Sequence, residues 1–291
     1  MEELLQTTIN GLASGSILAL GAIGLSLVYG ILKLVNFAHG DFMTLGGYAA
    51  FVVNVTLGLP LIAAALGAIV VVAVLGLVLE WAIWRPMRNR GAGIMQLLLM
   101  TIGLAFVLRN LILFVWGGEV RTLDVDQTQA WHPFGLTISL NQVIVITAAG
   151  VVLVAVGLLL KLTRLGKSMR AMSDNQDLAE VAGINTGRVI TYTWILSGSL
   201  AGLAGMFAAI NTTLSPNTGW FLLLPIFAAV VLGGIGNAYG ALVGGLAIGL
   251  VQEWSTMIFV PTYKEAVGFA VLILILLVRP QGIFGHRERT A

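Results

Sequence analysis

Long apolar runs recur along the chain and are separated by short polar connections. A run of about 20 apolar residues can cross a bilayer as a helix, because each residue adds about 1.5 Å to the length of a helix. The pattern predicts an all-α fold: a polytopic membrane helix bundle of about eight spans (seven to nine), with half-crossing or broken helices allowed. The apolar runs lie near 5–30, 37–57, 61–84, 94–116, 141–161, 189–211, 220–237, 241–259 and 264–280.

Composition agrees with a membrane protein. Of the 291 residues, 58% are hydrophobic and only 10% are charged, whereas a soluble domain carries roughly 25% charged residues. The net charge of +2 comes from a few basic connections, so we expect it to reflect membrane topology and not nucleic-acid binding. Cysteine is absent, which excludes disulfides and thiolate metal sites. We expect no metal and no cofactor.

Basic residues gather in three places, which the positive-inside rule assigns to the cytoplasm. The connection between the first two clusters, 117–140, carries Glu119, Asp124 and Asp126, so we place it outside. The N-terminus is then external and the C-terminus cytoplasmic. Nine crossings satisfy this arrangement, seven satisfy it if the chain re-enters near Gly233, and eight require one half-crossing segment. The clusters are Arg85, Arg88 and Arg90; Lys161, Arg164, Lys167, Arg170 and Arg188; and Arg279, Arg287 and Arg289.

Two places are candidates for a helix break or for the substrate pathway. Asn36, His39 and Asp41 lie where the first two apolar runs meet, and polar residues at such a position usually face a cavity or a protein interior. The alternative is a wet cytoplasmic turn whose side chains cap the next helix. His39 has only Asp41 at ligand spacing, which is too little for a metal site. Gly233 and Gly234 form the second candidate break.

Glycine is frequent, at 36 residues, and clusters inside the apolar runs. Gly240 with Gly244, and Gly245 with Gly249, have the spacing of small residues that lets two helix backbones approach closely. The pattern predicts a tightly packed bundle, which any class of membrane protein could use.

The connection 162–188 is far longer than a simple link between helices requires. Ser173 or Asp174 could cap a short helix there, and Gly183 could end it. Leu178, Val181 and Ala182 would form an apolar stripe on that helix, beside Asp177 and Glu180. Such a helix suits docking into a groove of a soluble partner. The alternative is a solvated connector on the lipid headgroups. We treat 1–291 as a single transmembrane domain that carries this loop.

Catalytic and nucleotide-binding patterns are missing from the sequence. Gly166-Lys167-Ser168 imitates the end of a phosphate-binding loop, but the required glycine five positions earlier is Lys161, and an apolar run precedes it. No nucleophile elbow or zinc-protease motif occurs, so we do not expect an enzyme. Glu80, Glu253, Arg109 and Gln96 are ionisable or polar residues within or at the ends of apolar runs, and we interpret them as packing or interfacial residues.

Several motifs, in order along the chain, resemble those of the LivH-type permeases of ATP-binding-cassette (ABC) importers for branched-chain and other neutral amino acids. The resemblance implies a permease of a bacterial inner membrane, driven by ATP hydrolysis on separate subunits. The motifs are NFAHGD at 36–41, LGGY at 45–48, RAM at 170–172, AGIN at 182–185, SGSLAGLAG at 197–205 and AVVLGGIG at 229–236.

The resemblance also implies partners. These are two ABC ATPase subunits, a second permease subunit that is identical or a sister, and an external substrate-binding protein. The segment 170–185 matches the region through which such permeases contact their ATPases, and the candidate docking residues there are Arg170, Asp174, Asp177, Glu180 and Gly183.

Other functions stay open on sequence alone. Permeases for urea or short amides look similar, so the solute is not fixed. A stand-alone channel or secondary transporter would usually carry more ionisable residues within its spans. For an importer of a neutral solute we expect a pathway that is apolar, rich in glycine and poor in charge, with Asn36, His39 and Asp41 at its inner end or at a helix break.

Overall fold

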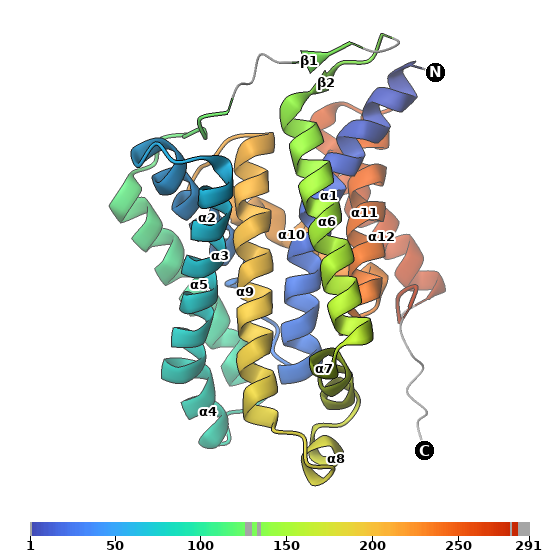
Figure 1. The fold of residues 1–291 in the computed structure, drawn as a ribbon. Coiled ribbons are helices and arrows are strands. Elements are labelled where there is room, and N and C mark those ends of the chain that lie inside the picture. The colour runs from blue at the N-terminus through green and yellow to red at the C-terminus, as the bar shows by residue number, and fades with distance from the viewer. Residues whose placement is uncertain (1, 126–129, 133–134, 280, 285–291) are drawn as a thin grey trace.

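The computed structural model describes residues 2–125, 130–132, 135–279 and 281–284. It is a bundle of roughly parallel and antiparallel helices (Figure 1), as the apolar pattern predicts. The α-helices are α1 (Glu2–Leu32), α2 (His39–Phe51), α3 (Leu61–Leu79), α4 (Arg85–Asn89), α5 (Ile94–Trp116), α6 (Leu140–Leu162), α7 (Arg164–Asp174), α8 (Gln176–Val181), α9 (Thr186–Asn211), α10 (Thr218–Gly233), α11 (Ala238–Ser255) and α12 (Lys264–Val278). Short π-helical segments η1 (Val52–Thr56) and η2 (Glu80–Trp84) and the 3-10 turn η4 (Pro261–Tyr263) complete the helical part.

Two short strands lie outside the bundle. β1 (Ala130–Trp131) pairs with β2 (Ile138–Ser139) in antiparallel register, within the connection between α5 and α6. They cover the end of the bundle where the N-terminus lies (Figure 1).

All nine predicted apolar runs contain a helix, but the helices differ in length. Among the described residues, six are long and apolar enough to cross a membrane: Glu2–Leu32, Leu61–Asn89, Ile94–Trp116, Leu140–Leu162, Thr186–Asn211 and Pro261–Val278. The other three runs hold the shorter helices α2, α10 and α11. The protein is therefore a polytopic helix bundle that combines full-length helices with shorter ones.

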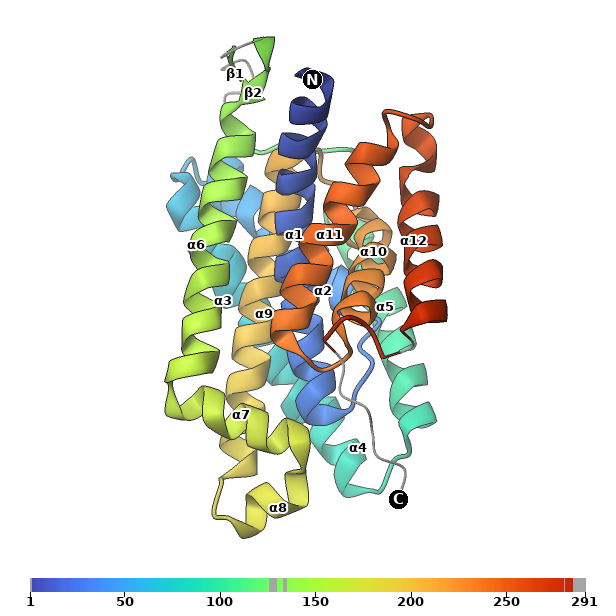
Figure 2. The ribbon, with the colours of Figure 1, turned by 90° about the vertical axis from the view of Figure 1, so that its right-hand side faces the viewer.

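The described parts of the basic clusters lie at one end of the bundle. Helices α4, α7 and α8 are found there, opposite the N-terminus, and α12 runs toward that end but stops short of it (Figures 1 and 2). The connection between α5 and α6 lies at the N-terminal end. This separation is the one that the topology prediction requires. Asp126, Arg287 and Arg289, which also entered that prediction, lie outside the described residues.

Helices α1 and α9 form the interior of the bundle. In the most apolar stretch of α1, 89% of residues are buried, and in α9 the share is 83%. The corresponding share is 22% in α5 and 6% in the last span. Since an outward face of Leu, Ile, Val and Phe is stable only away from water, these outer helices have the surface of lipid-facing spans.

Glycines bring α11 close to two neighbours. A Cβ on Gly245 or Gly249 would collide with the backbone of α1, and a Cβ on Gly240 or Gly244 would collide with the backbone of α10. The two predicted pairs of small residues thus face different helices, and each allows a close backbone approach. Helix α11 is wedged between α1 and α10 by this packing.

Candidate functional site

The helical structure is interrupted where the first two apolar runs meet. Helix α1 ends at Leu32, and residues 33–38 run without helical structure before α2 begins at His39. Asn36 holds this turn: its Oδ1 accepts a hydrogen bond from the Ala38 backbone N (3.1 Å), and its backbone O accepts one from His39 N (3.2 Å). Residues 33–38 therefore interrupt the helical structure between α1 and α2.

Asn36, His39 and Asp41 are each 0% exposed. The interpretation of this segment as a wet turn is wrong, because the turn folds back between helices and does not stay at the surface. The capping role is also wrong, since the residue before α2 is Ala38 and no side chain caps the helix.

His39 ties the start of α2 to the middle of α1. Its Nε2 lies 2.9 Å from the backbone O of Gly21, and this oxygen can only accept, so Nε2 donates. Gly24 makes room for the ring, because a Cβ there would stand 3.0 Å from the imidazole Cε1. Among the described residues, His39 Nδ1 has no hydrogen-bond partner. His39 therefore packs α2 against α1 through one ring nitrogen, and the other ring nitrogen makes no hydrogen bond with the described residues.

Asp41 connects three helices through one arginine. Its Oδ1 accepts a hydrogen bond from Arg109 Nε of α5 at 3.1 Å. The guanidinium also lies over the ring of Trp220 of α10, 4.2 Å from its centroid, in a cation–π contact. This arginine, which the sequence marked only as a packing residue, joins α2, α5 and α10.

The first turns of α2 and α10 meet directly. The Gly40 and Gly219 backbones are in contact, and a Cβ on either residue would overlap the other's carbonyl group. The Gly219 backbone N donates to Thr44 Oγ1 at 2.9 Å. The two shorter helices therefore start against each other in the protein interior.

Gly233 and Gly234 end α10. Gly234 has a φ of +104°, a left-handed conformation that favours glycine. The residues after α12 fold under this end, where Ile283 N donates to Leu232 O at 2.7 Å and Phe284 N donates to Gly233 O at 3.2 Å. The chain therefore leaves the helix at these glycines, and the carbonyl groups of Leu232 and Gly233 are bonded within the protein.

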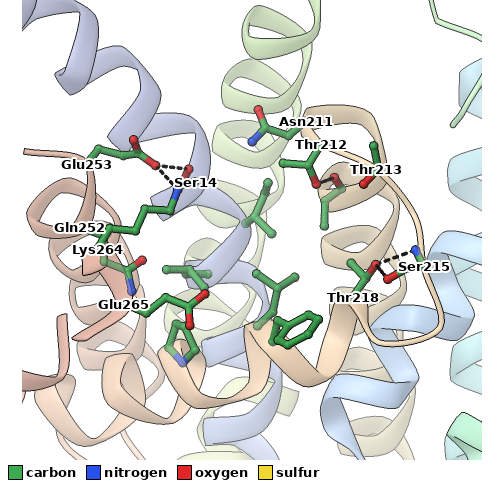
Figure 3. A pocket seen from close by; sticks show the side chains of 16 residues that line it. Ser14, Asn211, Thr212, Thr213, Ser215, Thr218, Gln252, Glu253, Lys264 and Glu265 are labelled. Carbon is green, nitrogen blue, oxygen red and sulfur yellow. Dashed lines mark hydrogen bonds and ion pairs between the residues drawn. The ribbon is translucent and has the colours of Figure 1, made fainter. Parts of the chain in front are cut away.

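A cavity of about 370 Å³ opens among α1, α9, α10, α11 and α12 (Figure 3). It lies toward the N-terminal end of the bundle, because its lining comes from the end of α9, the end of α11 and the starts of α10 and α12. Neither the residues of the first break nor those of the second line it. The lining residues are Ser14, Ile17, Leu18, Ala208, Asn211, Thr212, Thr213, Ser215, Thr218, Phe221, Leu222, Pro225, Gln252, Glu253, Lys264 and Glu265.

Charges occupy one wall of the cavity. Lys264 Nζ lies 3.0 Å from Glu253 Oε1, and Ser14 Oγ lies 3.4 Å from the same oxygen. Figure 3 shows these residues on one side and Asn211, Thr212, Ser215 and Thr218 on the other. The sequence marked Glu253 only as a packing residue. The available signal in the sequence was that Glu253 and Lys264 lie on either side of the short connection between two apolar runs.

Glu80 and Gln96 do have packing roles. Glu80 is buried and bonded to Arg88, and its Oε2 also accepts a hydrogen bond from Trp194 Nε1 at 2.8 Å. Gln96 Oε1 accepts from the Gly93 backbone N at 3.0 Å, which caps the start of α5.

Helices α7 and α8 form a platform at the end opposite the N-terminus (Figure 2). Asn175 caps α8 through its side-chain oxygen, which accepts from Leu178 N at 2.9 Å. The predicted caps, Ser173 and Asp174, are wrong, because α7 continues through both. The predicted end is confirmed: Gly183 follows α8 with a φ of +85°.

The predicted stripe on α8 faces outward. Leu178 is 66% exposed and Val181 is 87% exposed. Asp174, Asp177 and Glu180 are exposed as well, and they form no ion pair with any described residue. Arg170 differs from them, because its guanidinium donates to the backbone O of Leu160 at the end of α6. This hydrogen bond attaches α7 to the end of α6.

Comparisons with known proteins agree on one family. The model of the branched-chain amino acid transport system permease component matches residues 7–276. The LivH permease of the high-affinity branched-chain amino acid transport system of Escherichia coli K12 is 34% identical, over 98% of this chain and 96% of its own. The corresponding permease BraD of Pseudomonas aeruginosa is 31% identical with the same coverage.

A more distant relative is the ribose import permease RbsC of Escherichia coli K12, which is 27% identical over 92% of this chain and 84% of its own. No solved structure matches the chain significantly. The family match covers both helix breaks, the cavity and the platform, and it confirms the resemblance seen in the motifs. The chain belongs to the family of permease components of branched-chain amino acid transport systems.

Proposed function

We propose that this chain is the membrane-spanning subunit of an ABC importer that moves branched-chain or other neutral amino acids into the cytoplasm. ATP hydrolysis on separate ATPase subunits drives the transport. Besides family membership, the observation that carries the proposal is the exposed, apolar and acidic face of α8 at the basic end of the bundle. A membrane protein without a soluble partner has little use for two large aliphatic side chains in water.

The basic end of the bundle is the cytoplasmic end in this proposal, because Lys and Arg are retained on that side of a membrane. The N-terminus and the strand pair β1–β2 then lie outside, and the protein resides in the bacterial inner membrane as one transmembrane domain. An external binding protein delivers the solute, and a second permease subunit, identical or a sister, completes the membrane part.

The ATPases dock on α7 and α8. Leu178 and Val181 enter a groove of the partner, and Asp174, Asp177 and Glu180 select its charge, in the manner of a helix bound in a groove. Gly183 ends the docking helix, and Arg170 holds the platform to α6.

Contacts within the chain offer a route from the platform to the helix break. Lys33 Nζ donates to the backbone O of Ser173 at 3.2 Å, and Gly30 lies against the Ser173 side chain. Lys33 is the first residue of the nonhelical segment 33–38, which contains Asn36 and leads to His39 and Asp41 at the start of α2. A shift of α7 and α8 on ATP binding therefore pulls on the start of α2, and through Gly40 on the start of α10.

A charge reversal tests the docking role. Asp177→Lys combined with Glu180→Lys is expected to reduce ATP-driven leucine uptake to about one tenth or less, because a charged contact between proteins is turned from attraction into repulsion. The measurement is uptake into vesicles that contain the complete importer, together with copurification of the ATPases. Asn89→Lys, which adds an exposed positive charge at the same end but away from α8, is the control and should leave both unchanged. Normal uptake and ATPase binding in the double variant would exclude this docking surface.

A further inference from the structure

We infer that the cavity beside Glu253 and Lys264 binds one zwitterionic amino acid on its way through the protein. The inference rests on the proposed function and assigns the residues that recognise the solute. Its volume of about 370 Å³ falls in the range of small-molecule sites, about 300–1,000 Å³. It lies on the side of the bundle that faces outward in the proposed topology, where a solute would enter.

The charges of the cavity match those of the solute. Glu253 is only 9% exposed, and Lys264 neutralises it across 3.0 Å. An amino acid brings an ammonium and a carboxylate on the same carbon. It replaces one ion pair with two, because its ammonium binds the Glu253 carboxylate and its carboxylate binds the Lys264 ammonium. Glu265 lines the same wall of the cavity, beside Gln252 (Figure 3).

The same exchange rejects solutes with one charge or none. A buried charge without a partner is costly. A carboxylic acid would pair with Lys264 and leave the buried Glu253 carboxylate without a partner. An amine would pair with Glu253 alone and leave Lys264, whose side chain is 41% exposed, to water, so it gains one ion pair where an amino acid gains two. Urea or a short amide has no charge to exchange for the existing ion pair. The cavity therefore favours amino acids over the amide class of solutes.

Aliphatic side chains line the part of the cavity that the charges leave free. Ile17 and Leu18 of α1 are 4% and 3% exposed, and Leu222 and Pro225 of α10 complete this surface. Burying an aliphatic side chain there is favourable by roughly 25 cal/mol per Å² of apolar area. The surface suits a branched aliphatic side chain and disfavours a charged one.

The hydroxyl-rich wall opposite the charges helps to hold the solute. Thr218 Oγ1 accepts a hydrogen bond from the Ser215 backbone N at 2.8 Å and lies 3.2 Å from Ser215 Oγ. Together with Asn211 and Thr212 these groups offer donors and acceptors to the carboxylate or to water around it.

Direct binding tests the inference. The complete importer in lipid nanodiscs, without the binding protein, is titrated with L-leucine, with 3-methylbutylamine, which lacks the carboxylate, and with 4-methylpentanoate, which lacks the ammonium. Wild type should prefer leucine over both. Lys264→Met should weaken leucine about tenfold or more and remove the preference over the amine, since a charge-assisted hydrogen bond is lost. Glu253→Gln should remove the preference over the acid.

Two further variants separate recognition from folding. Lys161→Met removes an exposed lysine far from the cavity and should bind leucine like wild type. Glu253→Lys combined with Lys264→Glu keeps an ion pair but exchanges its ends. It should still assemble with the ATPases yet fail to restore leucine binding, because the solute would have to enter reversed. Restored binding in the exchanged variant would show that the pair is only structural and would overturn the inference.

The outcomes also separate this inference from the proposed function. Equal leucine affinity in wild type, Lys264→Met and Glu253→Gln, with ATP-driven leucine uptake intact, overturns the cavity site and leaves the importer in place. A wild-type assembly that takes up no leucine or other neutral amino acid overturns the proposed function, and the cavity assignment with it.

Discussion

Two ion pairs of the bundle have almost the same length and very different surroundings. Asp41 and Arg109 are 3.1 Å apart, with side chains 0% and 14% exposed. Glu253 and Lys264 are 3.0 Å apart, with side chains 12% and 41% exposed. The first pair is enclosed by α2, α5 and α10, and the second forms the wall of a cavity. The difference separates an ion pair that only holds helices together from one that a solute in a cavity could reach, and the exposure of the side chains is what differs between them.

The largest expected effect comes from the enclosed pair. Asp41→Ala leaves the Arg109 guanidinium without its carboxylate, and the loss of one partner of a buried pair costs about 3–5 kcal/mol. We expect a large fall in the unfolding temperature and in the yield of the purified protein, measured by thermal unfolding in detergent. Asp41→Leu with Arg109→Met removes both charges and should recover much of the loss. An Asp41→Ala protein as stable as wild type would contradict the role of this pair in holding helices together.

A smaller effect is expected where α2 meets α10. Gly219→Ala forces a methyl group into the Gly40 carbonyl, and overpacking of this kind costs about 1–3 kcal/mol. The same thermal measurement applies, and Gly103→Ala is the matched control. A Cβ on Gly103 meets no atom within 4 Å, so that change should stabilise α5 slightly, because alanine is the better helix former. Equal effects of the two substitutions would show that the α2–α10 contact is not tight.

The smallest effect on stability is expected at the cavity. Lys264 is partly exposed, and a pair that solvent reaches contributes less than about 1 kcal/mol. Lys264→Met should therefore unfold close to the wild-type temperature although it binds leucine poorly. A destabilisation as large as that of Asp41→Ala would place both pairs in the same structural class and remove the contrast.

The apolar runs and the end of α8 could be predicted from the sequence, because both depend on neighbouring residues, whereas the predicted caps of α2 and α8 were wrong. The length of a run decides whether a helix can span, and Gly183 ends α8 through its own backbone conformation. The break before α2 could be predicted in position but not in environment. Asn36, His39 and Asp41 are equally suited to water and to a polar pocket, and burial depends on how α1, α5 and α10 surround them.

Contacts between residues far apart in the sequence could not be predicted from the pattern of apolar and polar positions. Asp41 and Arg109 lie 68 positions apart, and no periodicity tells which helices are neighbours in a bundle. The cavity was missed for the same reason. In the sequence, Glu253 is one carboxylate near the end of a span. Only the folded protein shows that Lys264 of α12 pairs with it and that α10 lines the opposite side of the cavity. The exposed apolar stripe could be predicted because Leu178 and Val181 belong to one short helix.

The glycine packing of α11 has a mechanical consequence. Because backbone touches backbone on both sides of this helix, α1, α10 and α11 have almost no room to slide, and we expect them to move as one body. Helix α12 carries Lys264 but only 6% of its most apolar stretch is buried, so we expect α12 to be the wall of the cavity that moves. Spin labels on α11 and α12 should then report distance changes during transport, while labels on α1 and α11 keep theirs. A solute bound between Lys264 and Glu253 would then also break the ion pair that holds α12 to α11.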